Sequence, residues 1–537
     1  MDIPENPTKS KKEKIKIWLK NPYNFCFLAV LIAIIAIRIH YFLLTKNQPL
    51  WWDESEYLAI AKNYAGIVSY NAPAQRLPGF PLFVSIFYIL GLKSEPLLRF
   101  LVCFIPSIIA IILMYFCINE MYSDKRIAII SLTIFGVLWE HLFYSNRFHT
   151  ENFGLIFDLL AVFILFRSYL KKENLFFIKQ KYSLVWIVFF GLVAGFFRPG
   201  NLVFLVPLFI FLIFVNKSRL FNKKTYPIWI AFLILLILGA FFFNNLPLPK
   251  HGIFSKEGLL SYFNVNNKIS WSSLTVFKGF YQAINISMPN ILYYAFLLGF
   301  LIIIGRFFIY PEALKKLSPD KENLDLKSDI FNIFILLSIL AYFIFGLRSQ
   351  AYEFRWFFPL IISMFVFTSK GMICFSEFIS GLLNYKKLAI LFIIVILSLG
   401  VYTQFVHADF IIKDKLNSYI QVKEASLWIK ANSEKDDIIL SRSTPQTIYY
   451  SERKTYGFAF MNETQFLELV NKIHPKFMIE SALEPNPAAW GLTPTENIQK
   501  LLTPMNAWFI DAEKKQAILI VFEFNQQNSS NSYQKSF

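Results

Sequence analysis

The chain has 537 residues, of which 55% are hydrophobic and 18% aromatic. A mean hydropathy of +0.46 excludes an ordinary soluble protein and indicates a membrane protein with several spans. The formal net charge is +17, but Lys and Arg fall mostly in short segments between apolar runs, so nucleic acid is set aside as a partner. The cysteines show no disulfide or metal-ligand spacing and do not indicate a redox compartment: Cys26, Cys103, Cys117 and Cys374.

The first apolar run follows a lysine-rich segment and has no small-residue cleavage site. Residues 1–23 are therefore predicted to be a basic cytoplasmic N-terminus, followed by a retained span and a membrane domain over residues 24–405. Apolar runs of about 20 residues predict eleven spans. These spans lie near 24–44, 95–119, 127–145, 152–170, 183–199, 200–215, 227–246, 289–309, 330–347, 355–370 and 388–405.

The positive-inside rule sets the orientation of these spans. With the N-terminus in the cytoplasm, each inner loop carries a basic pair: Lys125-Arg126, Lys171-Lys172, Lys223-Lys224, Lys315-Lys316 and Lys386-Lys387. This agreement requires residues 78–91 to form an interfacial helix instead of a span, which their short length, Pro78 and Pro81 favour. We therefore expect a multi-pass protein of the cytoplasmic membrane, with the 45–94 loop and the C-terminal tail outside.

The tail, residues 406–524, is predicted to be a small extracytoplasmic α/β domain. Helical patterns at 422–432 and 463–472 alternate with strand patterns at 438–440, 476–480, 507–510 and 517–524. The tail has no Gly-rich phosphate loop or catalytic triad, which favours an acceptor-binding or structural role over an enzymatic one. Residues 525–537 are polar and predicted to be disordered.

The stretch from Trp51 to Tyr57 follows the first span and places three carboxylates beside two indoles. Trp favours the membrane interface, whereas acids near a bilayer are costly and usually functional. The spacing predicts a short interfacial helix with Asp53 and Glu54 at its N-terminus, and Glu56 is expected to point elsewhere. The two carboxylates suit a general base or ligands of a divalent cation, although helix capping alone explains one acid.

Four arginines are predicted at the same outer level of the membrane: Arg76, Arg147, Arg198 and Arg355. Guanidinium groups bind phosphate in a bidentate manner, although each arginine alone is better explained as an interfacial anchor. Together with the nearby acids, they favour an outward-facing site for a phosphate-bearing lipid.

The predicted outer turn near residues 146–151 adds His149 and Glu151. Glu151 is expected to face the same cavity as Asp53. His149 is either an interfacial hydrogen-bonding residue or, with Asp53 and Glu151, a metal ligand. Glu353, in an aromatic run before a late proline, and Tyr57 complete the predicted site.

These motifs together resemble the glycosyltransferase-C (GT-C) superfamily. The features are the Asp-Glu pair after the first span, an Arg-x-Pro-x-x-Pro run, an acid after the third span, the run Gly191-x-x-x-Gly195-x-x-Arg198-Pro199 and a late Glu-x-Arg-aromatic run. The likeness covers roughly residues 20–405 and is to bacterial and archaeal relatives of protein O-mannosyltransferases and of the lipid A aminoarabinose transferase. An outward α/β tail is also typical of many members.

The resemblance implies an inverting hexosyl- or pentosyltransferase. Its donor would be a polyprenyl- or dolichyl-phosphate monosaccharide, and its acceptor a protein, lipid or glycan outside the membrane. By motif position, Asp53 would be the catalytic base, Glu54 its support and Glu151 the second acid, which is often Asp in the family. The arginines that would hold the donor phosphate are Arg76, Arg198 and Arg355, with Arg147 beside them. Some members use a divalent cation, so Mg²⁺ or Mn²⁺ stays open as a cofactor.

Two other classes of protein remain as alternatives. A transporter or flippase for an anionic lipid or glycan would also need arginines and intramembrane acids, but it normally places them near the midplane and often shows inverted repeats. A non-catalytic membrane assembly protein would tolerate Asp53→Asn and Arg355→Ala without a change in phenotype.

Overall fold

The computed structural model describes residues 18–70, 73, 76–175, 178–220, 230, 284–285, 287–288, 290–309, 324–342, 354–458, 461–484, 495–510, 513 and 516–525. The expected span at 227–246 and the site residue Glu353 lie outside the described residues, apart from residue 230 of that span. The chain divides into two compact units. The membrane unit comprises Met1–Thr45, Arg99–Asn146 and Thr150–Lys413, and the loop–tail unit comprises Lys46–Leu98, Arg147–His149 and Asp414–Phe537.

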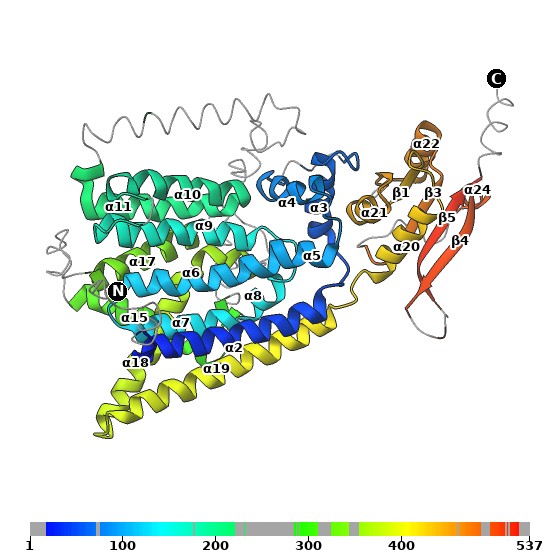
Figure 1. Ribbon diagram of the computed structural model, residues 1–537. Coiled ribbons are helices and arrows are strands. Elements are labelled where there is room, and N and C mark those ends of the chain that lie inside the picture. The colour runs from blue at the N-terminus through cyan, green and yellow to red at the C-terminus, as the bar shows by residue number, and fades with distance from the viewer. Residues whose placement is uncertain are drawn as a thin grey trace. The chain divides into compact units, whose positions relative to one another are not determined.

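The membrane unit is built from helices. They are α2 (Pro22–Thr45), η1 (Phe100–Phe104), α6 (Ile105–Met121), α7 (Lys125–Val137), α8 (Trp139–Tyr144), α9 (Glu151–Ile164), η2 (Leu165–Leu170), η3 (Gln180–Tyr182), α10 (Ser183–Phe197), η4 (Pro199–Phe204), α11 (Leu205–Leu220), α15 (Ile291–Ile309), α17 (Leu324–Tyr342), η8 (Phe354–Leu360), α18 (Ile361–Leu382) and α19 (Lys387–Asp414). Within the described part of the chain, six helices are long and apolar enough to cross a membrane. The polytopic helical architecture is therefore confirmed. Helices α2 and α19 run side by side (Figure 1), where Tyr41 donates a hydrogen bond to Asp409.

The expected span 127–145 is not one continuous helix. The backbone breaks at Leu138, between α7 and α8. The backbone groups on both sides of the break have partners, because Trp139 N donates to Gln404 Oε1 at 2.9 Å and Gly136 O accepts from Arg38 Nη2 at 3.1 Å. A helix can be interrupted inside a membrane domain when its freed polar groups are satisfied in this way.

Several expected span boundaries are also wrong, among them the end of the last span, because α19 continues to Asp414 beyond the expected residue 405. Helix α17 begins at Leu324, before the expected start near residue 330, and α18 continues to Leu382, through the first part of the expected inner loop 371–387. These helices tolerate charged residues because the charges are paired. Lys370 Nζ donates to the buried Asp329, which also accepts from Tyr122 Oη at 2.9 Å. A paired carboxylate is far less costly to bury than an isolated one.

Helices α15 and α18 approach each other through glycines. A Cβ atom on Gly371 would lie 1.9 Å from the carbonyl oxygen of Ala295, and a Cβ on Gly299 would lie 1.8 Å from that of Phe367. Small residues at such crossings allow two helix backbones to touch, which is a common way of packing helices in membranes.

The loop–tail unit combines the first loop with the tail. Its helices are α3 (Trp52–Tyr64), α4 (Gly79–Ile89), α20 (Ile420–Ala431), α21 (Thr444–Ser451), α22 (Glu463–Ile473) and α24 (Glu496–Leu501), and α5 (Glu95–Arg99) leads into the membrane unit. Helix α4 has 11 residues and is roughly 16 Å long, about half of the hydrocarbon thickness, so it is too short to span.

The tail forms one five-stranded sheet in the order β2-β1-β3-β5-β4. The strands are β1 (Ile438–Ser441), β2 (Lys454–Tyr456), β3 (Phe477–Ser481), β4 (Leu502–Phe509) and β5 (Ala517–Phe524). Strand β1 is parallel to β2 and β3, whereas β5 is antiparallel to β3 and β4. The expected small α/β domain is confirmed (Figure 1).

The tail sheet has a hydrophobic core on each face. Ile439 and Ile479 pack with residues of α20, whereas Leu440 and Met478 pack with residues of α22 and α24. Successive side chains of a strand point to opposite faces, so this alternation explains the continuous apolar runs of β1 and β3.

We expect Gly371→Ala to push α18 away from α15. Overpacking of this kind costs about 1–3 kcal/mol, so the thermal unfolding temperature of the purified protein in detergent should fall. Gly381→Ala on the same helix is the matched control, because a Cβ there meets nothing within 4 Å. Equal melting temperatures for the two variants would contradict the close approach of the helices.

Candidate active site

One group of charged side chains lies at the start of α3. We call Asp53, Glu54, Glu56, Arg76 and Arg147 the loop carboxylate group. Every member of this group belongs to the loop–tail unit.

Glu54 is fully buried in this group. Its Oε2 accepts from Trp51 N at 2.9 Å and from Arg147 Nη1 at 3.0 Å, and its Oε1 accepts from Phe148 N at 3.0 Å. The Arg147 guanidinium also lies 3.8 Å from the centre of the Trp51 ring. A buried ion pair is stable only when its hydrogen-bonding groups find partners, as the oxygens of Glu54 do. Glu54 therefore ties the 147–149 turn to α3.

Arg76 joins the other two acids of α3. Its Nη2 donates to Asp53 and its Nε donates to Glu56, whose other oxygen accepts from Trp52 Nε1 at 2.9 Å. The expectation that Glu56 points elsewhere is wrong, since residues three apart on a helix lie on the same side. Burial raises the pKa of Glu56, against the opposing effects of Arg76 and Trp52. The guanidinium of Arg76 lies 5.1 Å from the centre of the Tyr57 ring.

Asp53 is the most accessible acid of the loop carboxylate group. Its side chain is 23% exposed, compared with 7% for Glu56 and 0% for Glu54. An incoming ligand therefore reaches Asp53 more readily than the other two carboxylates.

A second group lies in the membrane unit, at the start of α9. Glu151 is the first residue of that helix, and its Oε1 lies 3.8 Å from Arg198 Nη2 and 3.7 Å from Arg355 Nε. Arg198 Nη2 also donates to the backbone carbonyl of Arg355 at 2.9 Å. The structure thus brings together one acid and two arginines from separate regions of the sequence. Arg198 Nη1 is buried and has no hydrogen-bond partner within the described ranges.

The sequence analysis missed Asp158 and Asn201, which extend this group. Asp158 is buried on α9, seven residues after Glu151, and its Oδ2 accepts from Asn201 Nδ2 at 2.5 Å. Gly154, between the two acids, makes room for this contact, because a Cβ there would lie 2.8 Å from Asn201 Nδ2. The signal was present in the sequence, since acids at positions i and i+7 with glycine at i+3 share one face of a helix. We call Glu151, Asp158, Arg198, Asn201 and Arg355 the α9 carboxylate group.

His149 is buried in the loop–tail unit, and its backbone N–H donates to the carbonyl of Arg147 at 2.8 Å. Among the described residues, no three His, Cys, Asp or Glu side chains gather as metal ligands. Asp53 and His149 belong to the loop–tail unit and Glu151 to the membrane unit, so the expected ligand set stays a prediction, and no chemical step is derived through a metal.

The far end of α3 is held by the tail. Lys62 Nζ donates to Glu452 Oε1 at 2.7 Å and to the carbonyl of Tyr449 at 2.8 Å. Leu50, just before α3, donates its backbone N–H to Tyr450 Oη at 2.9 Å. Helix α21 and the residue after it therefore hold both ends of α3.

Glu452 binds a second lysine on its other oxygen, because Lys430 Nζ donates to Oε2 at 2.6 Å. Burial tends to raise the pKa of Glu452, but the hydrogen bonds from Lys430 and Lys62 outweigh burial and lower it to about 2. The carboxylate therefore stays ionised across the physiological pH range.

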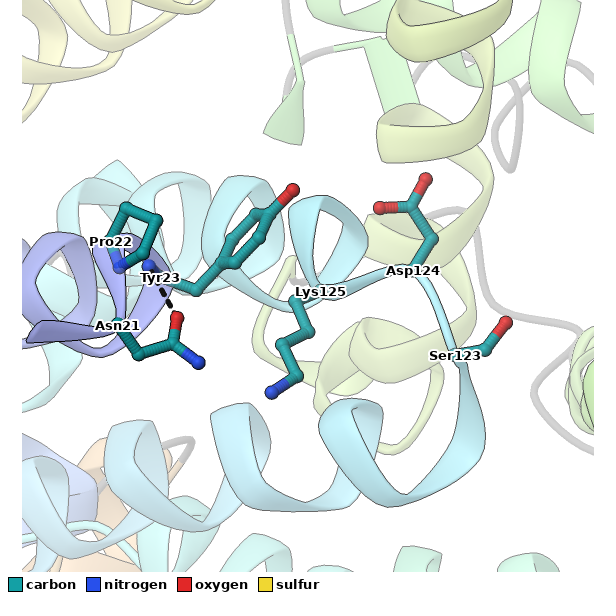
Figure 2. Close-up of a pocket in the computed structure, with 6 residues that line it drawn as sticks. All are labelled: Asn21, Pro22, Tyr23, Ser123, Asp124 and Lys125. Atoms are coloured by element: carbon teal, nitrogen blue, oxygen red, sulfur yellow. Dashed lines mark hydrogen bonds between the residues drawn. The ribbon is translucent and has the colours of Figure 1, made fainter. Parts of the chain in front are cut away.

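A pocket of about 500 Å³ lies elsewhere in the membrane unit (Figure 2). It is lined by Asn21, Pro22, Tyr23, Ser123, Asp124 and Lys125. Both carboxylate oxygens of Asp124 already accept from Arg126. This pocket shares no residue with the two carboxylate groups.

No protein-family model and no curated protein matches the sequence. Solved structures do match the fold. The apo oligosaccharyltransferase of Archaeoglobus fulgidus is 13% identical, with 84% of this chain and 69% of that chain covered and a TM-score of 0.54. ArnT of Cupriavidus metallidurans, bound to undecaprenyl phosphate, is 11% identical, with 92% and 98% covered and a TM-score of 0.55.

A further structure is the oligosaccharyltransferase AglB of Archaeoglobus fulgidus in complex with an inhibitory peptide and a dolichol-phosphate. It is 13% identical, with 95% of this chain and 75% of that chain covered and a TM-score of 0.51. AglB and ArnT are both GT-C glycosyltransferases. The chain therefore has the GT-C fold, and the resemblance expected from the sequence motifs is confirmed at the level of the fold.

Proposed function

We propose that the chain is an inverting glycosyltransferase of the cytoplasmic membrane. It moves a monosaccharide from a polyprenyl- or dolichyl-phosphate donor to an acceptor on the outer face, with its N-terminus in the cytoplasm and its tail outside. The observation that carries the proposal is an accessible Asp53 beside a buried, fully bonded Glu54, in a chain with the GT-C fold. Similar structures bound to undecaprenyl phosphate and dolichol-phosphate support this class of donor.

In the proposed reaction, an acceptor hydroxyl attacks the anomeric carbon of the donor sugar. The bond between that carbon and the phosphate oxygen breaks, and the lipid phosphate leaves with the bonding electron pair. Asp53 takes the hydroxyl proton as general base. Arg76 holds the Asp53 carboxylate in place, and Glu54 keeps the start of α3 fixed. A base fixed in this way is ready for proton transfer without a large rearrangement.

Arg198 and Arg355 are the proposed ligands of the donor phosphate. Both guanidinium groups lie within 4 Å of Glu151, and Arg198 Nη1 makes no hydrogen bond within the described residues, so this N–H group of Arg198 remains for a phosphate. Guanidinium groups that bind the leaving phosphate stabilise the charge that develops in the transition state. Arg76 and Arg147 already bind carboxylates, so we assign them to orienting the acids instead.

Asp53→Asn tests the base directly. Purified protein receives a radiolabelled polyprenyl-phosphate sugar and membrane-extracted acceptors, and transferred label is measured. We expect a loss of about 100-fold or more, since an amide accepts no proton but still accepts a hydrogen bond from Arg76. The control is Asp436→Asn, an exposed tail residue. Undiminished transfer in Asp53→Asn would remove this residue from the base role.

Arg198→Lys tests the proposed phosphate site. Lysine keeps the positive charge but loses the planar fork, so the KM for the donor should rise about tenfold or more while the acceptor KM changes little. Arg126→Lys is the control. Arg126 pairs with Asp124 and Glu377, and none of these three residues belongs to the α9 carboxylate group. A change confined to the acceptor KM would contradict the assignment to the donor.

Lys62→Met tests whether the tail positions α3. We expect kcat to fall about tenfold with the donor KM nearly unchanged, because Lys62 acts through the placement of Asp53 and not on the lipid donor. Lys430→Met removes the other lysine of Glu452 and leaves the contacts of α3 intact, so its kcat should stay within about twofold of the parent. Equal kcat values for Lys62→Met and the parent would exclude this positioning role.

A further inference from the structure

The strand order of the tail sheet changes direction between β1 and β3. From β1 the chain passes through α21 to β2 on one side, and from β2 it passes through α22 to β3 on the other side of β1. Helix α21 packs against α20, which covers one face of the sheet, whereas α22 covers the other face. In open α/β sheets, ligands bind beyond the carboxyl ends of the strands at such a point.

Charged side chains gather at this edge. Arg442 follows β1 directly, Glu480 is near the carboxyl end of β3, and Glu484 comes three residues after β3. All three are buried, and Arg442 Nη1 lies 3.8 Å from Glu480 Oε1. These residues lie in the tail and belong to neither of the two carboxylate groups.

Two side chains at this edge, Glu480 and Gln446, have buried polar atoms without hydrogen-bond partners in the described part of the chain. Neither carboxylate oxygen of Glu480 accepts a hydrogen bond within the part of the chain that the structure describes. The side-chain oxygen and nitrogen of Gln446 also have no hydrogen-bond partner there. Gln446 lies in the first turn of α21, just after β1. Buried polar groups in folded proteins are nearly always bonded, so unused groups at a switch point indicate a ligand.

The chemistry of these groups selects one class of ligand. Carboxylates only accept hydrogen bonds, a guanidinium only donates them, and an amide does both. A sugar hydroxyl also does both and carries no charge. A cation would meet Arg442, and an anion would meet two glutamates. Burial raises the pKa of Glu480 to about 7, with Arg442 opposing and Glu484 adding to the effect, which also suits an uncharged ligand.

We propose that the carboxyl edge of β1 and β3, with Arg442, Gln446, Glu480 and Glu484, binds a saccharide. Its assignment to the glycan part of an acceptor rests on the proposed function. Helix α21 supplies Gln446 to this edge and also holds α3, which carries Asp53. The proposal thus narrows the acceptor from any protein, lipid or glycan to an acceptor that already carries a saccharide.

Saturation-transfer NMR on the full-length protein tests the site. The protein is prepared in an amine-oxide detergent, because alkyl maltosides carry sugars themselves. The probes are free glucose, galactose, mannose, N-acetylglucosamine and their disaccharides. We expect transfer to at least one probe, reduced at least fivefold in Glu480→Gln and in Gln446→Leu. Glu496→Gln, an exposed change on α24, should leave transfer unchanged.

The melting temperature separates binding from folding. If the role of Glu480 is to bind a ligand, its carboxylate does not stabilise the unliganded fold. Glu480→Gln then replaces a buried carboxylate without hydrogen bonds by a neutral amide, so the unliganded protein should melt at the same or a higher temperature. If the only role of Glu480 is its ion pair with Arg442, the variant should have a lower melting temperature than the parent. A lower melting temperature, no transfer to any probe, or equal transfer in Glu480→Gln and the parent would each overturn the proposal.

The outcome does not depend on glycosyl transfer. Asp53→Asn should keep saccharide binding, because Asp53 is not part of the edge. Binding that is lost in Glu480→Gln, in a protein that transfers no sugar in any assay, would uphold the site and reject the proposed function. A protein that transfers sugar to an acceptor but binds no saccharide at the edge would uphold the proposed function and reject the site.

Discussion

The buried pair of Glu54 and Arg147 is the contact on which the loop carboxylate group depends. It joins α3 to the 147–149 turn, although the two residues are 93 positions apart in the sequence. Removing one partner would leave an unpaired charge in the protein interior, which costs about 3–5 kcal/mol. The pair also gives the adjacent acids Asp53 and Glu54 different roles. Glu54 uses its oxygens to hold structure, and this leaves Asp53 as the accessible carboxylate.

Buried charge pairs also join helices within the membrane unit. Glu120 accepts from Arg167 at 2.9 Å and from Lys171 at 2.6 Å, so the ends of α6 and η2 are joined by charges and not only by apolar packing. Lys370 and Asp329 do the same for α18 and α17. A charge close to the hydrocarbon region is expensive unless it has a partner. The helices of this unit can therefore extend past the ends expected from hydropathy.

Hydropathy and periodicity were enough to predict the helical membrane architecture and the alternating tail, because these depend on composition within short windows. They did not locate the break at Leu138, whose partners Arg38 and Gln404 are far away in the sequence. Asp53, Glu54 and Arg76 were identified from local motifs, but their contacts were not. The pairing of Glu56 with Arg76 depends on the path of the loop between them, which no local pattern encodes.

Helix α21 was also missed, since eight residues are too few for a clear periodic signal. It is nevertheless the helix of the tail that forms hydrogen bonds to α3 and to Leu50 before it. Its first turn contributes Gln446 to the sheet edge, and its last turn and the following residue bind Leu50 and Lys62. Any coupling between a ligand at the sheet edge and α3 would run through this helix. Coupling follows only if the ligand binds one placement of α21 more tightly than another. The hydrogen bonds of Lys62 to Tyr449 and Glu452 would then carry a change in the position of α21 to α3, which bears Asp53.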